Sequence, residues 1–143
     1  MKIKALHPKF QVPTRASEFA GGFDLYMPED GYIESYADKG VLVGLGFAAS
    51  VPRGHVALLL PRSGVGAKHG LELNNTCGVI DSDYTGEWKA CLRVKDIANF
   101  RWKAGERLLQ MVIVPVHTPT EFFLVADLDE TGRSAGGFGS TGA

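Results

Sequence analysis

The chain has 143 residues, 45% of them apolar and 22% charged, which is typical of a single soluble globular domain. Its formal net charge of −1 gives no bulk electrostatic reason to expect a nucleic-acid or membrane partner. The N-terminal residues carry no apolar signal region, and no stretch approaches the length of a membrane span. We therefore expect a cytoplasmic protein (host cytoplasm if the source is viral), in which an anionic ligand would need a local cluster of cations.

Metal-binding side chains are few and scattered. The two cysteines form no CxxC pair, and the histidines lie far apart along the chain (Cys77 and Cys91; His7, His55, His69 and His117). This spacing favours neither a zinc site nor a disulfide framework.

Glycine is over-represented, at 18 residues, about twice the average share, which indicates many turns. Between the turns lie short apolar runs of strand length, rich in Val, Leu, Ile and Phe. In chain order, the expected strands cover residues 41–49, 56–60, 108–116 and 121–125. One short helix is expected at 63–70, with a Ser at its start and a Gly at its end. The pattern predicts an all-β barrel or sandwich with one short helix.

The first candidate functional residue is Asp24, which stands between two apolar residues after Gly21 and Gly22. An aspartate in this position can face a metal-bound water. A turn aspartate without a function explains the pattern equally well.

The segment 60–70 reads LPRSGVGAKHG and places Arg62 and Ser63 between an expected strand and the expected helix. Free backbone N–H groups at a helix start favour an anion, to which Arg62 adds a forked donor and Ser63 a hydroxyl. The alternative is a capped helix with an exposed arginine, and the residues alone do not decide between the two.

The segment 78–88 reads GVIDSDYTGEW, a short strand followed by two turns. In a functional interpretation, Asp81 is a general base for a water molecule and Tyr84 is a flat wall for a sugar ring. Asn75, just before this strand, offers an amide to the edge of a base. The alternative is a plain hairpin with solvated carboxylates.

The C-terminal residues 131–143 read TGRSAGGFGSTGA and contain no large apolar residue except Phe138. We therefore expect a β domain at 1–130 and a flexible, glycine-rich arm at 131–143. Alone, such a segment cannot bury enough surface to fold, and a disordered tail is one interpretation. The other is an arm that orders over a ligand through Arg133 and Phe138.

Five motifs of this chain together resemble those of the trimeric dUTPase family, and they occur in that family's order. They are GGFDL at 21–25, PRSGVGAKHG at 61–70, GVIDSDYTGE at 78–87, RLLQ at 107–110 and RSAGGFGSTG at 133–142. The resemblance implies a jelly-roll-like barrel as the subunit and a homotrimer with active sites at subunit boundaries. It also implies that the C-terminal arm closes over a neighbour's site.

The resemblance further implies a reaction, the Mg²⁺-dependent hydrolysis of dUTP to dUMP and pyrophosphate. Asp81 would activate the water that attacks the α-phosphorus, and Tyr84 would lie under the deoxyribose. Mg²⁺ would bind mainly through the substrate phosphates and reach Asp24 through water. The other expected substrate contacts fall into three groups. The phosphates would contact Arg62, Ser63, Gly64 and Gln110, and uracil would contact Asn75, Gly78 and Val79. In the arm, Phe138 would stack on the base, Arg133 would bind the γ-phosphate, and Gly139 would also contact the substrate.

Two other functions are compatible with the fold that the resemblance implies. A dCTP deaminase shares it, but the position of that enzyme's catalytic Glu falls on Cys91, and Tyr84 and the third motif favour dUTP. The second alternative is a regulatory protein that binds a partner protein on the same scaffold, although Asp81, Tyr84 and the arm are all present.

Overall fold

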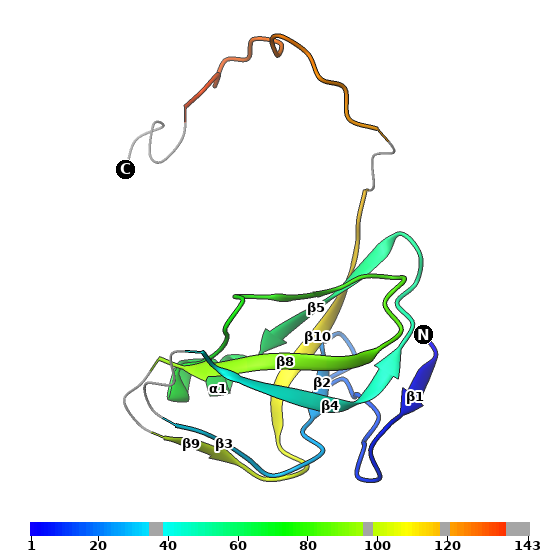
Figure 1. Ribbon diagram of the computed structural model, residues 1–143, viewed down its shortest axis with the longest axis vertical. Helices are drawn as coiled ribbons and strands as arrows, with labels where there is room; N and C mark the ends of the chain where they lie inside the picture. The colour runs from blue at the N-terminus through cyan, green and yellow to red at the C-terminus, as the bar shows by residue number, and fades with distance from the viewer. Residues whose placement is uncertain (35–38, 96–98, 118–120, 137–143) are drawn as a thin grey trace.

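Short strands and one helix make up the computed structural model, which describes residues 1–34, 39–95, 99–117 and 121–136 (Figure 1). The strands are β1 (Ile3–Ala5), β2 (Phe23–Tyr26), β3 (Gly31–Ile33), β4 (Val41–Ala49), β5 (His55–Pro61), β6 (Leu71–Leu73), β7 (Gly78–Ile80), β8 (Glu87–Val94), β9 (Phe100–Trp102) and β10 (Arg107–Pro115). The helix α1 spans Ser63–His69. No helix in the described part of the chain is long and apolar enough to cross a membrane.

The strands pair in antiparallel fashion in three sheets. One sheet has the order β1-β4-β8-β6, a second the order β2-β10-β5-β7, and β3 pairs with β9. In Figure 1, β4 and β8 lie in front of β5 and β10, and buried residues of both larger sheets belong to one core cluster. The pairing of β5 with β10 runs from Pro61↔Leu109 to His55↔Pro115. Residues of the candidate site lie at both ends of this pair.

Alternating side chains of the two larger sheets form the core. In β8, Trp88, Ala90 and Leu92 are buried and the residues between them are more exposed, as expected of a strand with one face against a core. Phe47 of β4 packs on Trp88 with ring centroids 5.1 Å apart, and Leu59 of β5 is fully buried. The apolar alternation therefore determines which face of each sheet points inward.

The opposite face of the β2-β10-β5-β7 sheet is also apolar but remains partly exposed. Leu58 of β5 pairs with Val112 of β10 and with Val79 of β7, and Val79 is 57% exposed. Since side chains alternate along a strand, these residues point away from the core. We call this surface the outer apolar face; it consists of Val56, Leu58, Leu60, Val79, Val112 and Val114. Contiguous apolar surface of this kind marks interaction sites.

Most of the predicted elements are confirmed. The strand expected at 41–49 has the same bounds, and those expected at 56–60 and 108–116 differ by one residue at their ends. The expected helix ends at His69, because Gly70 adopts a left-handed φ of 60° and donates its N–H to the Gly66 carbonyl at 3.0 Å. Ser63 is the first helical residue, and Arg62 occupies the N-cap position without a side-chain cap hydrogen bond.

The strand predicted at 121–125 is wrong. These residues form no strand, and the side chains of Phe122 and Leu124 are 93% and 103% exposed. A strand needs a partner for its backbone N–H and C=O groups, and none of the described strands pairs with this segment. We call residues 121–128, which also expose Phe123, Val125 and Leu128, the exposed apolar segment. It lies outside the sheets, upstream of the boundary expected at residue 131.

Candidate active site

Asp24, Arg62 and Arg107 form a cluster of ion pairs at one end of the β2-β10-β5 sheet. Gln110 of β10 pairs with Asp24 of β2 on one side and with Leu60 of β5 on the other, so these three side chains share the outer face. The Asp24 side chain is 9% exposed. Its Oδ1 forms an ion pair with Arg62 Nε at 2.8 Å, and its Oδ2 accepts a hydrogen bond from Arg107 Nη1 at 3.1 Å. Three of the motifs thus meet at one carboxylate.

Arg62 is held at further points and faces a hollow lined by cations. Its backbone N–H donates to the Leu108 carbonyl at 2.9 Å, and its Nη1 donates to the Arg107 carbonyl at 3.1 Å. Arg62, Arg101 and Arg107 line an open cavity of about 620 Å³. This is the local cluster of cations that an anionic ligand requires in a chain of nearly zero net charge.

The other residues expected at the phosphates lie around this cluster. Ser63 and Gly64 begin α1 and are exposed, and backbone N–H groups in a first helical turn lack acceptors within the helix. Gln110 Nε2 donates to the Pro61 carbonyl at 3.2 Å. A Cβ at Gly22 would lie only 2.6 Å from Gln110 Oε1, so the glycine makes room for the amide.

Asp81 and Tyr84 lie together in the turn after β7. The Tyr84 N–H donates to the Asp81 carbonyl at 3.2 Å, and both side chains are exposed. The Tyr84 hydroxyl donates to the Glu87 carbonyl at 2.8 Å, which folds the ring back toward Gly86. The turn therefore offers a carboxylate and a fixed aromatic face to a ligand.

Asn75 lies in the tight turn between β6 and β7. Its Nδ2 donates to the Cys77 carbonyl at 3.1 Å, and the Cys77 N–H donates to the Asn75 carbonyl at 2.7 Å. Thr76 between them has a φ of 68°, which is rare for a β-branched residue. Gly78 and Val79 follow in β7, paired with β5. The turn that carries Asn75 is therefore a strained but well-bonded structure.

The two groups of expected site residues do not meet within one chain. Arg62 directly follows the last residue of β5, whereas Asp81 follows Ile80, which pairs with Ala57 near the other end of that strand. At about 3.3 Å per residue, this register places Asp81 roughly 20 Å from Arg62 along the sheet. The outer apolar face lies between them.

Of the expected arm residues, only Arg133 lies in the described part of the chain. Its Nε donates to the Gly136 carbonyl at 2.9 Å, and Ser134 beside it has a left-handed φ of 44°. Phe138 and Gly139 lie outside the described residues, so their expected roles stay predictions. Among the described contacts, Arg133 makes no hydrogen bond or ion pair with Asp24 or Arg62, and its role at the γ-phosphate also stays a prediction.

Two guanidinium groups flank Asp24, the residue expected to reach a metal ion through water. Among the described residues, no group of three or more His, Cys, Asp or Glu could hold a metal ion. Each Asp24 oxygen already forms an ion pair with a guanidinium, and a hydrated cation would approach between two positive charges, which oppose it. The metal contact expected of Asp24 and the binding of Mg²⁺ through the substrate phosphates therefore stay predictions.

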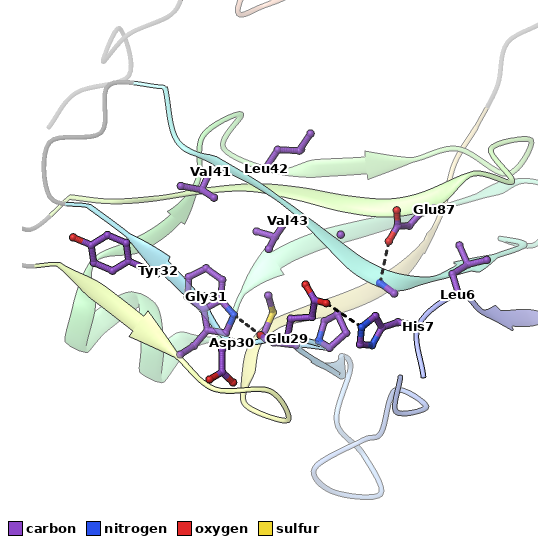
Figure 2. A pocket seen from close by; sticks show the side chains of 15 residues that line it. Leu6, His7, Glu29, Asp30, Gly31, Tyr32, Val41, Leu42, Val43 and Glu87 are labelled. Atoms are coloured by element: carbon purple, nitrogen blue, oxygen red, sulfur yellow. Dashed lines mark hydrogen bonds and ion pairs between the residues drawn. The ribbon is translucent and has the colours of Figure 1, made fainter. Parts of the chain in front are cut away.

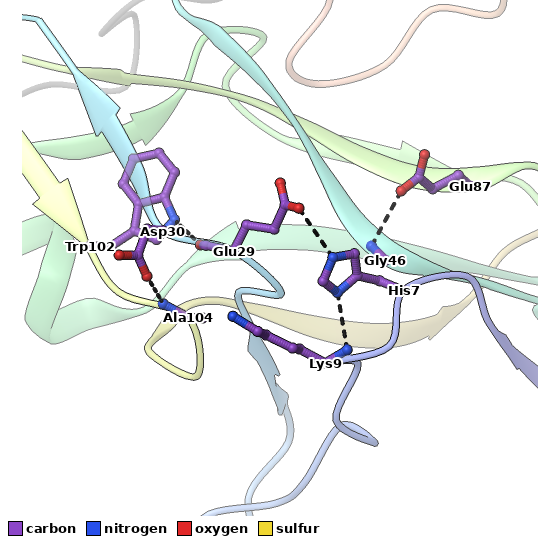
Figure 3. Close-up of polar contacts among 8 residues, drawn as sticks. All are labelled: His7, Lys9, Glu29, Asp30, Gly46, Glu87, Trp102 and Ala104. Atoms are coloured by element: carbon purple, nitrogen blue, oxygen red, sulfur yellow. Dashed lines mark hydrogen bonds and ion pairs between the residues drawn. The ribbon is translucent and has the colours of Figure 1, made fainter.

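A separate cavity of about 350 Å³ opens between β3 and β4 and contains none of the expected site residues (Figure 2). Its polar groups bind one another: Trp102 Nε1 donates to the Glu29 carbonyl at 3.0 Å (Figure 3). Asp30 accepts hydrogen bonds from Lys103 Nζ at 2.7 Å and the Ala104 N–H at 2.9 Å, which hold the pKa of its carboxyl below the ordinary 3.8. These contacts tie the turn before β3 to Trp102 of β9 and to the loop after it.

Two residues with contacts to the site were not singled out from the sequence, Arg107 and Glu87. Glu87 Oε1 accepts the Gly46 N–H at 3.3 Å (Figure 3), and a Cβ at Gly44 would lie 2.5 Å from the same oxygen. Since the Glu87 carbonyl also holds Tyr84, this residue links the Tyr84 turn to β4. Both residues stand inside recognised motifs, but their partners are distant in sequence.

Comparisons with known proteins identify the family. A sequence model described as dUTPase matches residues 8–142. A deoxyuridine 5'-triphosphate nucleotidohydrolase of Nautilia profundicola is 42% identical over 142 residues, which cover 99% of this chain and 98% of that protein. The enzyme of the same name from Syntrophotalea carbinolica is 39% identical over 142 residues, which cover 99% of this chain and 96% of that protein. The chain belongs to the dUTPase family, whose members named here are enzymes.

Solved structures confirm the β-rich fold. A dUTPase of Staphylococcus bacteriophage 80alpha, described with dUPNHPP and in connection with the transfer of virulence genes, has a TM-score of 0.86 at 27% identity and covers 99% of this chain and 98% of its own. A dUTPase variant of phage phi11 of S. aureus, described with a structural Mg(II) ion, has a TM-score of 0.80 at 24% identity. The match covers 90% of this chain and 98% of the phage chain. At this lower identity, the similarity to the phi11 structure supports the fold alone.

Proposed function

We propose that this enzyme hydrolyses dUTP to dUMP and pyrophosphate by attack of water on the α-phosphorus. The observation that carries the proposal is the arrangement of the outer sheet face. A cation cluster around Arg62 lies at one end of it, and the exposed Asp81 and Tyr84 lie at the other. The relatives named as dUTP nucleotidohydrolases and the phage enzyme described with dUPNHPP support this substrate.

Each active site in this proposal takes residues from more than one copy of the chain. One chain keeps Asp81 and Arg62 roughly 20 Å apart along the sheet, and the outer apolar face between them is available to a neighbour. The exposed apolar segment provides a second surface, with Leu128 87% exposed. A closed homotrimer with three shared sites would cover both surfaces.

At the phosphate end, Arg62, Ser63, Gly64 and Gln110 would bind the triphosphate. The guanidinium and the N–H groups at the start of α1 donate to oxygens whose negative charge grows on the leaving pyrophosphate. Mg²⁺, held by the phosphates, would supply further neutralisation of that charge. Arg101 and Arg107, which line the same cavity as Arg62 and outnumber its one carboxylate, Glu106, would add to the positive potential.

At the nucleoside end, Asn75 and the backbone at Gly78 and Val79 would bind the edge of uracil. Tyr84 would pack under the deoxyribose and leave no room for a 2′-hydroxyl. Asp81, exposed in the same turn, would accept a proton from the attacking water. The Asp81 carboxylate is exposed in the single chain, and the neighbouring copy and the arm would enclose it in the assembled site.

The C-terminal arm would complete the site. Phe138 would stack on uracil, with Gly139 beside it, and Arg133 would bind the γ-phosphate. Closure of such an arm excludes water and strengthens the electrostatic interactions inside. This part of the proposal rests on the fifth motif, RSAGGFGSTG, which lies inside the family match at 8–142.

Release of pyrophosphate from dUTP in the presence of Mg²⁺ tests the proposal, with dCTP, dTTP and UTP as controls. The expected result is release from dUTP alone. Ammonia release from dCTP would identify a deaminase instead, an alternative that the family match does not favour. A regulatory protein partner and the cytoplasmic location stay predictions. Light scattering on the same material would report the expected trimer.

A further inference from the structure

Asp24 is the most buried charged residue described in the chain, at 6% exposure of the whole residue. It lies between two guanidinium groups, with Arg62 Nε 2.8 Å from Oδ1 and Arg107 Nη1 3.1 Å from Oδ2. A buried carboxylate needs charged partners to offset its desolvation, and here both oxygens have one. Its charge is therefore already used within the chain.

We propose that Asp24 and Arg107 are positioning residues that hold the Arg62 guanidinium for the substrate phosphates, and that Asp24 does not contact the metal, even through water. The inference deepens the proposed function and rests on it, because it takes Arg62 as a phosphate contact. In place of the metal contact expected of it, Asp24 holds the side chain of Arg62.

The contacts of Arg62 define which of its donors remain for a ligand. Its Nε binds Asp24, its Nη1 binds the Arg107 carbonyl, and its backbone N–H binds the Leu108 carbonyl. A guanidinium has five N–H donors in a fixed plane, so the Nη2 edge and one Nη1 donor stay available. A long side chain restrained at these points is pre-organised and loses less freedom when a phosphate binds.

Arg107 acts on Arg62 from two sides. Its carbonyl accepts from Arg62 Nη1 at 3.1 Å, and its own guanidinium holds the opposite oxygen of the shared carboxylate. Without Asp24, two like charges would stand side by side and repel. Without the Arg107 guanidinium, only Arg62 would hold the Asp24 carboxylate. The carboxylate could then rotate, and the Arg62 guanidinium paired with it would no longer be fixed in one orientation.

The test measures binding of the non-hydrolysable analogue dUpNHpp by calorimetry, once in EDTA and once in Mg²⁺. The variants are Asp24→Asn, Arg107→Gln, Arg107→Lys and the double variant Asp24→Asn/Arg107→Gln. Asp30→Asn is the matched control. It removes an exposed carboxylate that lies outside the candidate site and accepts a hydrogen bond from Lys103 Nζ at 2.7 Å. The Mg²⁺ concentration for half-maximal turnover of dUTP is measured alongside.

We expect Asp24→Asn and Arg107→Gln each to weaken binding in EDTA by about tenfold or more, the scale of one charged hydrogen bond. The double variant should be little weaker than the worse single variant, because both changes break the same clamp. Arg107→Lys should lose part of the affinity, and the Mg²⁺ requirement of all variants should match that of the wild type. Asp30→Asn should change neither quantity.

Unchanged binding of Asp24→Asn in EDTA together with a raised Mg²⁺ requirement would overturn the inference, as would fully additive effects in the double variant. Thermal unfolding checks that Asp24→Asn folds; if it does not, the two Arg107 variants decide, since that side chain is 41% exposed. Failure of the proposed function is a different result: wild-type enzyme that neither binds dUpNHpp nor releases pyrophosphate from dUTP.

Discussion

The ring of Tyr84 lies so close to Gly86 that a Cβ at Gly86 would stand 2.7 Å from the hydroxyl oxygen. The same hydroxyl donates to the Glu87 carbonyl at 2.8 Å. Glu87 in turn is anchored to β4 through the Gly46 N–H. Tyr84 therefore has one favoured orientation, set by the absence of a side chain at Gly86 and by the hydrogen bond at its tip.

Gly86→Ala should weaken the discrimination between dUTP and UTP. The added methyl group displaces the end of a flexible side chain, so the ring moves and the fold stays intact. We expect the ratio of kcat/KM for dUTP over UTP to fall by about tenfold, within the range of one misplaced pocket contact. Thr85→Ala, at the exposed neighbouring position, is the control and should keep the ratio. An unchanged ratio in Gly86→Ala would refute the role of this contact.

Asp81→Ala should remove general-base catalysis and leave the fold unchanged. Its side chain is exposed in the described chain, so its loss costs little folding free energy. We expect kcat to fall by ~10²–10⁴-fold, the usual contribution of a general base, or about 3–5 kcal/mol of transition-state stabilisation. Asp83→Ala changes an exposed carboxylate of the same turn and should retain activity. Equal activity of the two variants would contradict the assignment.

Local patterns in the sequence are enough to predict the elements whose boundaries are determined locally. The strand at 41–49 follows Gly40, which has a left-handed φ of 64°, and the short helix stops at the left-handed Gly70. The segment 121–125 has the same apolar character, yet it forms no strand. Whether such a run becomes a strand depends on a pairing partner, which no pattern within the run reveals.

The candidate site divides in the same way. Residue types and motifs predicted roles for Asp24, Arg62 and Asp81, but they did not predict which side chains these residues contact. The Asp24–Arg107 contact joins residues 83 positions apart, and only the register of β10 against β2 and β5 brings them together. The separation of Asp81 from Arg62 depends on the register of β7 against β5, which residue types do not encode.

Thr76→Gly should stabilise the protein, because Thr76 has a φ of 68°, in a region that β-branched residues avoid. Relief of this strain should raise the free energy of unfolding by about 1 kcal/mol. Thr76→Ala keeps a Cβ and should gain less. Thermal unfolding of the three proteins measures the effect. A lower unfolding temperature for Thr76→Gly would show that the threonine makes a compensating contact.

Glu72 should make stability depend on pH in the acid range. Lys95, at 2.8 Å, and then Arg93, at 2.6 Å, hold the pKa of its carboxyl below the ordinary 4.5. Because the folded-state pKa is the lower one, the contribution is present above pH 4.5 and is lost as the pH falls through the folded-state pKa. Glu72→Gln should therefore unfold at a lower temperature than the wild type at pH 7, and the difference should disappear in strong acid. A difference of the same size at both pH values would contradict this interpretation.

The most direct test of an active site shared between copies is to mix two inactive variants. Arg62→Ala lacks the phosphate cluster and Asp81→Ala lacks the base, so each alone should release almost no pyrophosphate from dUTP. Co-expressed with different tags and purified through both, they should recover about a third of the wild-type activity, because a mixed trimer of either composition has one site in three that combines an intact Arg62 with an intact Asp81. Mixed oligomers as inactive as the separate variants, or an active enzyme that stays monomeric, would contradict the account.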